Sequence, residues 1–154
     1  MKTLLTASIV GLACGAMTAA CGPQNTPQPP QKTFQLRIYD AANMAKVRLT
    51  VADVVRSSAR VESGETAGSG FLYFRLTRDG VLKFRRLTHE LARRGSRVHR
   101  SQRVAIEIND RVYARPMVDY RVFPDGLDAS QGLQIGGLKL SVANRLADEI
   151  RNAQ

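Results

Sequence analysis

The chain has 154 residues, of which 23 are lysine or arginine and 13 are aspartate or glutamate, so its formal charge is +10. This length predicts one folded domain, and the charge makes nucleic acid, a membrane surface and acidic proteins the candidate partners. The sequence has no tryptophan and only 6% aromatic residues, which argues against a surface that stacks nucleic-acid bases. Both cysteines, Cys14 and Cys21, lie near the start, which excludes a disulfide framework or a zinc ribbon in the rest of the chain.

The first residues have the pattern of a secretory signal. Met1-Lys2 is a short basic start, and residues 4–20 are apolar and rich in small side chains, as in a signal peptide. The stretch ends in Thr18-Ala19-Ala20-Cys21, which resembles the bacterial lipobox, where the cleaved chain begins at a diacylated cysteine. The sequence therefore predicts a lipoprotein-type signal peptide over 1–20 and a palmitate-type lipid on Cys21. The alternative is ordinary cleavage after Ala20, which would leave a free N-terminal thiol.

Residues 21–33 form a proline-rich segment without aliphatic side chains. It holds four of the chain's six prolines, namely Pro23, Pro27, Pro29 and Pro30. This composition is typical of an extended tether, and at about 3.1 Å per residue it would reach roughly 35 to 40 Å. We therefore expect residues 34–154 to fold as one domain outside the cytoplasm. The expected location is the periplasmic side of the cell envelope, with the lipid as a membrane anchor.

The first part of this domain has the pattern of short strands. Residues 34–39 alternate, with Phe34, Leu36 and Ile38 on one side and Tyr39 on the other, which predicts a half-buried strand. Further along, we expect a short turn of helix within 41–55 capped by Thr50, a strand at 57–62, a loop at 63–70 and a central strand at 71–76.

The period then changes to that of a helix over 77–94, with Thr77 as its N-cap and Gly95 just past its end. One face is expected to be buried and consists of Gly80, Val81, Phe84, Leu87, Thr88, Leu91 and Ala92. The other face is charged, and only Leu82 lies on it as an apolar residue. A basic loop over 95–102 is expected to follow.

The last third predicts a hairpin, a connection and a second helix. Residues 103–113 form the hairpin, which turns at Asn109-Asp110, and Pro116 ends its pairing or places it at an edge. We then expect an extended stretch at 118–123, a turn at 124–126 and a short strand at 133–135 closed by Gly136-Gly137. The final helix is expected to be capped by Ser141 and to bury Val142, Leu146, Ala147 and Ile150. This order predicts an α+β fold, with two main helices on one face of a mainly antiparallel sheet.

The sequence contains no complete catalytic or metal-binding motif. His89-Glu90 begins the zinc-protease pattern HExxH, but Arg93 occupies the place of its second histidine. Gly68-Ser69-Gly70 has no phosphate-loop lysine, and turn chemistry explains Asp125 and Asp128. We therefore predict that the protein is not an enzyme and binds no cofactor or metal.

The positive charge is concentrated in one region. Residues 75–103 contain ten lysines and arginines against Asp79 and Glu90, on a helix face and the loop after it. The candidate binding residues are Arg85, Arg86, Arg93, Arg97 and Arg100. They are either a solvated helix face or a contact surface for anionic lipid headgroups, an acidic peptide or another envelope protein. DNA fits the charge but not the expected compartment, so nucleic acid is not predicted as a partner.

Four short motifs resemble one known family. They are Leu49-Thr50 with Asp53-Val54, the stretch from Leu76 to Thr88 that reads LTRDGVLKFRRLT, the hairpin VAIEINDRVYARP over 104–116, and Leu133-Gln134-Ile135-Gly136-Gly137 followed by Ala143 and Leu146-Ala147. In this order they resemble the head of the first periplasmic domain of SecD, the accessory subunit of the bacterial Sec export channel. The likeness covers residues 49 to 151, and Arg111 stands where the family has a glycine.

The resemblance implies both a fold and a role. Its motif residues are packing residues rather than catalytic ones, namely Gly80, Phe84, Thr88, Asp110, Pro116 and Gly136. SecD works with SecF and uses the proton-motive force through membrane helices that this sequence does not have. What the resemblance implies here is the role of the head, a non-enzymatic binding domain for exported polypeptide or Sec subunits. The alternative is an envelope lipoprotein that uses the fold for structure or interaction unrelated to secretion.

Overall fold

The structure is a computed structural model that describes residues 33–154. The expected signal peptide at 1–20, the lipidation site Cys21 and nearly all of the tether at 21–33 lie outside these residues. Within the described range, neither helix combines the length and the apolar character that crossing a membrane requires.

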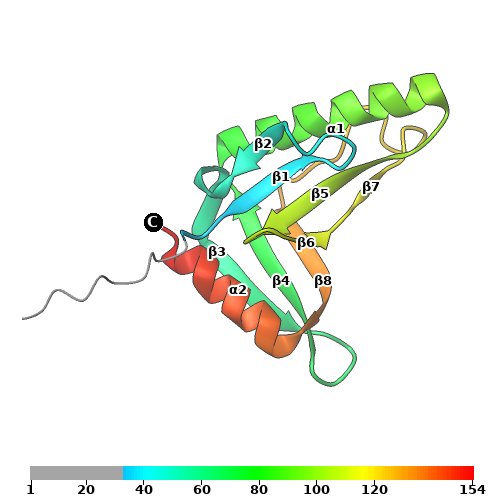
Figure 1. The fold of residues 1–154 in the computed structure, drawn as a ribbon. Coiled ribbons are helices and arrows are strands. Elements are labelled where there is room, and N and C mark those ends of the chain that lie inside the picture. The colour runs from blue at the N-terminus through cyan, green and yellow to red at the C-terminus, as the bar shows by residue number, and fades with distance from the viewer. Residues whose placement is uncertain (1–32) are drawn as a thin grey trace, which may run out of the picture. The chain divides into compact units, whose positions relative to one another are not determined.

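Two helices and eight strands make up this part of the chain (Figure 1). In chain order they are β1 Leu36–Asp40, β2 Val47–Thr50, the short 3-10 helix η1 Val51–Asp53, β3 Val54–Ser63, β4 Ser69–Leu76, α1 Arg78–Val98, β5 Gln102–Ile108, β6 Arg111–Ala114, β7 Met117–Val118, β8 Leu133–Lys139 and α2 Leu140–Asn152. All strand pairs are antiparallel. The predicted α+β fold is therefore confirmed.

The strands are divided between two sheets. One has the order β2-β1-β5-β6, with β7 also paired to β5, and the other has the order β3-β4-β8. α1 packs against β2, β1, β5 and β7 of the first sheet and also reaches β4, whereas α2 packs against β3, β4 and β8 of the second. Each helix thus has its own principal sheet (Figure 1). The prediction that both helices lie on one sheet was therefore wrong.

The core lies between these layers. In the first sheet Leu36 pairs with Ile108 and Ile38 with Ile106, and all four side chains are 0% or 1% exposed. The predicted strand near 34–39 is confirmed, but Tyr39 on its other face is also buried, at 2% exposure. Its hydroxyl donates a 2.6 Å hydrogen bond to Glu107 Oε2, and this partner explains how a polar aromatic side chain is accommodated there.

The segment 41–55 was expected to give a turn of helix, and it gives a strand first. β2 forms because Leu49 pairs with Ile38 and buries its side chain completely. The helical part is limited to η1 after Thr50, whose backbone N–H donates to Asp53 Oδ2 at 3.0 Å. Pairing with a neighbouring strand therefore decides most of this segment, and local capping decides only its last turn.

α1 begins as predicted and ends later than predicted. The Thr77 hydroxyl accepts a 3.0 Å hydrogen bond from Gly80 N, but the helix continues through Gly95 to Val98 and ends at His99, whose φ is 50°. Gly95 lies on the buried face, and a Cβ there would be 2.8 Å from Arg100 O. Gly95 therefore does not end the helix. It permits the chain that follows the helix to approach it closely.

The later elements confirm the hairpin and correct its surroundings. Asn109 and Asp110 form its turn with φ values of 49° and 63°, as expected for a two-residue hairpin loop. The extended stretch predicted for 118–123 is wrong beyond Val118. There the Asp119 carbonyl accepts from the N–H groups of Val122 and Phe123 at 3.1 and 2.8 Å, so the chain turns.

The start of α2 was also placed incorrectly. β8 runs through Gly136-Gly137 to Lys139, and α2 follows at once, so Ser141 lies inside the helix and is not its cap. Leu140 N donates to Gly68 O at 2.8 Å, and this loop carbonyl replaces a side-chain cap. Ala143 rather than Val142 belongs to the fully buried stripe, which is otherwise as predicted.

Candidate functional site

The outer face of α1 carries a row of exposed cations. Its members, together with one residue in the loop that follows, are called here the basic helix face and consist of Arg85, Arg86, Arg93, Arg97 and Arg100. Arg86, Arg93 and Arg97 lie at spacings of seven and four residues, which places them on one stripe of a helix. The opposite side of α1 supplies core residues such as Phe84, Leu87 and Leu91, so the stripe is directed away from the core.

Other charges of α1 are used to attach the helix to the first sheet and to η1. Lys83 Nζ lies 2.6 Å from the carboxylate of Asp53, and Arg94 donates to both oxygens of Asp40. Glu90, an acidic residue of the helix, is paired with Arg48 of β2 at 2.6 Å. Hydrogen bonding to Arg94 is the main cause that lowers the pKa of Asp40 below its ordinary value.

The basic helix face has no comparable partners. Among residues 33–154, none of its five arginines lies within ion-pair distance of a carboxylate. Hydrogen bonding from Ser130 is the main cause that lowers the pKa of Asp128, and the charge of Arg85 contributes to the same direction. The charges of this face are therefore available to a partner from outside the domain.

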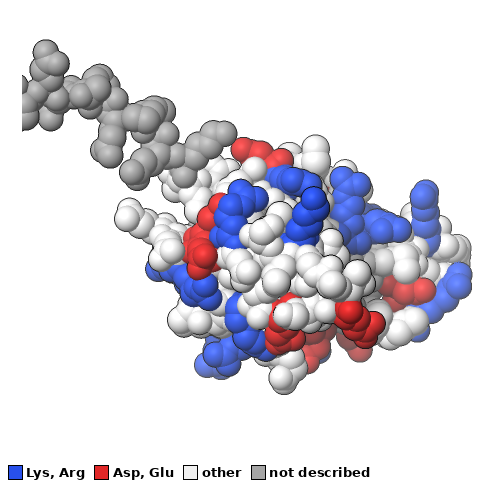
Figure 2. All heavy atoms as spheres, turned by 90° about the horizontal axis from the view of Figure 1, so that it is seen from below, with Lys and Arg blue, Asp and Glu red and all other residues white. Residues whose placement is uncertain are grey.

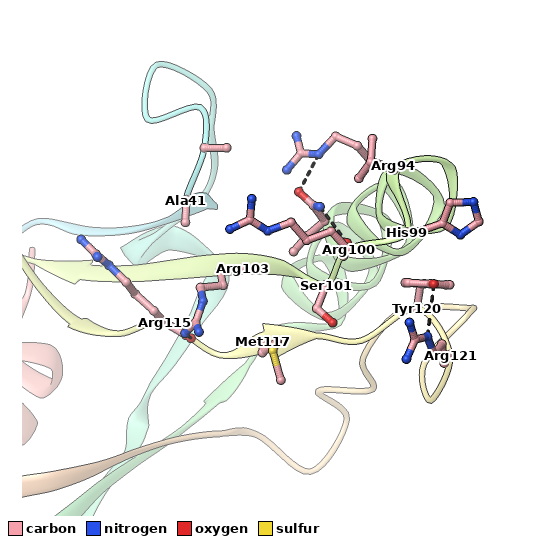
Figure 3. Close-up of a pocket in the computed structure, with 13 residues that line it drawn as sticks. Ala41, Arg94, His99, Arg100, Ser101, Arg103, Arg115, Met117, Tyr120 and Arg121 are labelled. Carbon is pink, nitrogen blue, oxygen red and sulfur yellow. Dashed lines mark hydrogen bonds between the residues drawn. The ribbon is translucent and has the colours of Figure 1, made fainter.

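A concavity of about 1040 Å³ lies at the C-terminal end of α1 (Figure 3). It is called here the arginine concavity, and the residues that matter for its chemistry are Arg100, Arg103, Arg115, Arg121, Val98 and Met117. Val98 and Met117 are 57% and 52% exposed. None of the residues that line it is an aspartate or a glutamate, so it combines positive charge with accessible apolar surface.

Strand pairing assembles this concavity from segments that are separate in sequence. Arg103 of β5 lies opposite Met117 of β7, and Arg115 lies between β6 and β7. Arg103 belongs to the basic region predicted from the sequence, whereas Arg115 and Arg121 were not predicted as members of a site. The β5–β7 pairing that brings them together involves only two residue pairs, and no sequence motif predicted this pairing.

The side chains around the concavity point in different directions (Figure 3). Arg94 and Arg100 point toward the turn at Ala41, Arg115 extends past Ala41 on its other side, and His99 points away. Gln102 holds this arrangement, since it accepts from Arg94 Nε at 2.9 Å and donates to Arg100 O at 2.9 Å.

The charge distribution on the side away from α1 is different. Figure 2 views the molecule from below and shows acidic and basic side chains around a broad uncharged area. The basic groups in that view lie at the end where Figure 1 places β7 and the C-terminal end of α1, and also on the opposite side of the domain. The excess of lysine and arginine over acidic residues lies mostly in residues 75–103, which include α1 and the loop after it.

The residues expected to pack α1 occupy tight positions. A Cβ at Gly80 would lie 2.4 Å from the Asp53 carbonyl oxygen, so the close approach is to η1. Phe84 is 1% exposed and Thr88 is 0% exposed. Thr88 Oγ1 donates to Phe84 O at 3.0 Å and accepts from Leu127 N at 2.9 Å, and the second bond attaches the 126–127 loop to the helix.

The other motif residues lie outside the core. Asp110 is in the hairpin turn and pairs with Arg37 at 2.6 Å. Pro116 follows the end of β6, and its carbonyl accepts from Val104 N at 3.0 Å. Gly136 lies within β8, where a Cβ would be 3.0 Å from the ring of Phe71.

The groups that these surfaces present are mainly guanidinium groups. In the described residues, no three His, Cys, Asp or Glu side chains are grouped so that they could hold a metal ion. His89 and Asp125 line a smaller hollow of about 330 Å³ together with Leu82, Arg85 and Arg86. The guanidinium groups can donate paired hydrogen bonds to carboxylate or phosphate oxygens.

The fold defines an α+β domain with two antiparallel sheets, and solved structures of the export component SecDF share it. No family model matches this chain, and none of the curated proteins matches its sequence. A structure of SecDF, described as a membrane component that enhances protein export, aligns with a TM-score of 0.54 and 22% identity. The alignment covers 73% of this chain and 44% of that one.

A second similar structure is SecDF in a super-membrane-facing form, also with a TM-score of 0.54 and 22% identity. Here the alignment again covers 73% of this chain but only 13% of the other. The chain therefore spans less than half the length of either SecDF chain that it matches. The resemblance to the SecD periplasmic head found in the sequence is confirmed at the level of the fold.

Proposed function

We propose that this protein is a non-enzymatic binding domain on the extracytoplasmic side of a membrane, which contacts exported polypeptide or a subunit of the Sec machinery. The observation that carries the proposal is the basic helix face, whose five arginines have no acidic partner within residues 33–154. A domain with the SecDF fold supplies a rigid support for it, because ion pairs and a buried stripe fix α1 in place.

The proposed anchor complements this surface. A lipid on Cys21 and the tether at 21–33 would keep the domain near a membrane while the tether gives it a reach of roughly 35 to 40 Å. Replacement of Cys21 by serine is then expected to release the protein into the soluble fraction of the cell envelope. Unchanged partitioning of the Cys21→Ser variant into detergent would contradict lipidation at this position.

The decisive test is crosslinking in live cells from a photoreactive residue at position 93. Arg93 is exposed at the middle of the basic helix face, and Asn144, exposed on α2, provides a matched control position. We expect position 93 to capture Sec subunits or newly exported chains, and position 144 not to do so. Capture of one unrelated envelope protein would instead support the interaction role separate from secretion, and equal capture from both positions would contradict a specific surface.

A charge-reversal variant tests whether the same residues supply the affinity. The change Arg85→Glu, Arg86→Glu and Arg93→Glu is expected to abolish salt-sensitive binding of the captured partner. Because the three side chains are exposed, the melting temperature should fall by no more than about 5 °C. A large loss of stability would show that these arginines are structural and would remove them as a contact surface.

A further inference from the structure

We propose that the arginine concavity is a binding site for an acidic, extended segment of polypeptide, with carboxylates on its guanidinium groups and apolar side chains on Val98 and Met117. This inference deepens the proposed function, since it names the chemistry of the partner. The concavity contains Arg100, Arg103 and Arg115 and no lining carboxylate. Its only strongly neutralised cation is Arg94, which is paired with Asp40.

The guanidinium groups of Arg100, Arg103 and Arg115 are available to bind a ligand. Among the described residues Arg100 and Arg115 make no side-chain ion pair, and Arg103 makes only a 3.5 Å hydrogen bond to the carbonyl oxygen of Arg115. Arg100 points toward the turn at Ala41, whereas Arg115 extends past Ala41 on its other side (Figure 3). The arginines that line one concavity without a carboxylate repel one another. A carboxylate bound there reduces that repulsion and forms charge-assisted hydrogen bonds with a guanidinium group.

Several observations favour polypeptide over a lone anion or a headgroup. The volume of about 1040 Å³ is at the upper end of the range for small-molecule pockets, about 300 to 1,000 Å³, so a single phosphate would fill little of it. Val98 and Met117 expose more than half of their surface there, and they offer contacts that a phosphate cannot use. An acidic peptide with interspersed apolar residues complements both properties.

The arginine concavity adjoins the basic helix face at the C-terminal end of α1, and this also favours an extended peptide as the ligand. α1 has 21 residues and is therefore about 31 Å long at 1.5 Å per residue. An extended peptide of about ten residues spans about 33 Å, so one segment could occupy the concavity and continue along the helix. The residues 1–32 of this chain contain no aspartate or glutamate and cannot supply the carboxylates.

Binding of a labelled peptide to the purified full chain tests the site. The probe is a peptide of about ten residues in which glutamate alternates with leucine and alanine, and its control has glutamine in place of every glutamate. We expect salt-sensitive binding of the acidic peptide and much weaker binding of the neutral one. Equal binding of both peptides would overturn the assignment of carboxylates as ligands.

Two variants at one position place the peptide in the concavity. Ala42 is exposed and lines the concavity beside the turn toward which Arg100 points. Ala42→Glu would present a carboxylate of the chain itself to these arginines and is expected to weaken peptide binding about tenfold or more. Ala42→Lys should not weaken it, and equal effects of the two variants would show that the charge of the concavity is not what the peptide recognises.

A second pair of variants separates the concavity from the helix face. Arg103→Gln with Arg115→Gln is expected to weaken peptide binding at least about tenfold, and more than Arg86→Gln with Arg93→Gln does. Unchanged binding in the first double variant would overturn the proposal. Flotation with vesicles of an anionic phospholipid provides the other comparison, and dependence of flotation on Arg103 and Arg115 without peptide binding would assign the site to a lipid surface instead.

These outcomes are distinct from those of the proposed function. If crosslinks from position 93 to exported chains persist in the Ala42→Glu protein, the proposed function stands and the concavity site fails. If position 93 captures nothing while the peptide binds as described, the concavity is a site for acidic polypeptide and the export role fails.

Discussion

α1 and α2 have similar inner faces and different outer faces. Both bury a continuous stripe that is centred on large apolar residues, such as Phe84 on α1 and Leu146 on α2. On the outside, α2 pairs its own charges, with Arg145 3.5 Å from Glu149 and Arg151 2.5 Å from Asp148. The outer arginines of α1 have no such partners among residues 33–154. Two helices with the same packing role can therefore differ outside the core. The outer charges of α2 are paired within the domain, whereas the outer arginines of α1 remain available to a partner.

Truncation of the inner faces tests the common part of this comparison and should have the largest effect. Phe84 and Leu146 are each 1% exposed. Phe84→Ala is expected to lower the free energy of unfolding by about 3 to 5 kcal/mol and Leu146→Ala by about 2 to 5 kcal/mol. Urea unfolding of the full chain measures both. A loss below about 1 kcal/mol in either variant would show that its helix does not belong to the core.

A smaller loss is expected when a methyl group is added where α1 touches η1. Gly80→Ala would place Cβ 2.4 Å from the Asp53 carbonyl oxygen, so the helix must move away. We expect a loss of about 1 to 3 kcal/mol, although alanine favours helix over glycine by about 1 kcal/mol. Ser96→Ala, at an exposed position of the same helix, should change stability by less than about 0.5 kcal/mol. A net gain from Gly80→Ala would contradict the tight approach.

The ion pair between Arg94 and Asp40 should make the stability of the fold depend on pH in acid. This pair represents the cations of α1 that do have acidic partners. Because the Arg94 guanidinium lowers the pKa of Asp40 in the folded state below its ordinary value of 3.8, the unfolded chain binds the proton more readily. The stabilisation is therefore complete above about pH 4 and is lost as the pH falls through the lower folded pKa. Arg94→Gln should reduce this acid-dependent loss, and an unchanged pH profile of unfolding would contradict the coupling.

Much of the inner structure could be predicted from sequence because it follows local periodicity. The buried face of α1, its Thr77 cap and the Asn109-Asp110 turn each depend on residues close together in the chain. The errors occurred where a distant segment decides the outcome. β2 exists because it pairs with β1, and α2 needs no Ser141 cap because Gly68 O accepts its first N–H.

The candidate site divides in the same way. The arginines of the basic helix face are visible from helical spacing alone, since Arg86, Arg93 and Arg97 share a stripe. That they lack partners could not be predicted, because Lys83 and Arg94 look equivalent in sequence and yet pair with Asp53 and Asp40. The arginine concavity needs the register of β5 with β7 and therefore became apparent only in the folded chain.

Single arginine truncations give the smallest effects and the sharpest contrast between the two outer faces. Arg145→Ala removes an i, i+4 pair with Glu149 and should cost about 0.3 to 0.5 kcal/mol. Arg93 stands four residues before Arg97, and like charges at this spacing destabilise a helix, so Arg93→Ala should gain about 0.2 to 0.5 kcal/mol.

Repeating this test at several salt concentrations strengthens it, because the trend with salt is easier to establish than one small difference in the free energy of unfolding. Added salt screens the repulsion between Arg93 and Arg97 as well as the attraction between Arg145 and Glu149. The gain from Arg93→Ala and the loss from Arg145→Ala should therefore both shrink toward zero as salt is raised during urea unfolding. If both truncations had the same sign at low salt, the outer faces of α1 and α2 would not differ as the ion pairs indicate. Opposite signs that converge at high salt would show that the charges of α1 carry a cost in the isolated domain, which a partner with negative charge would relieve.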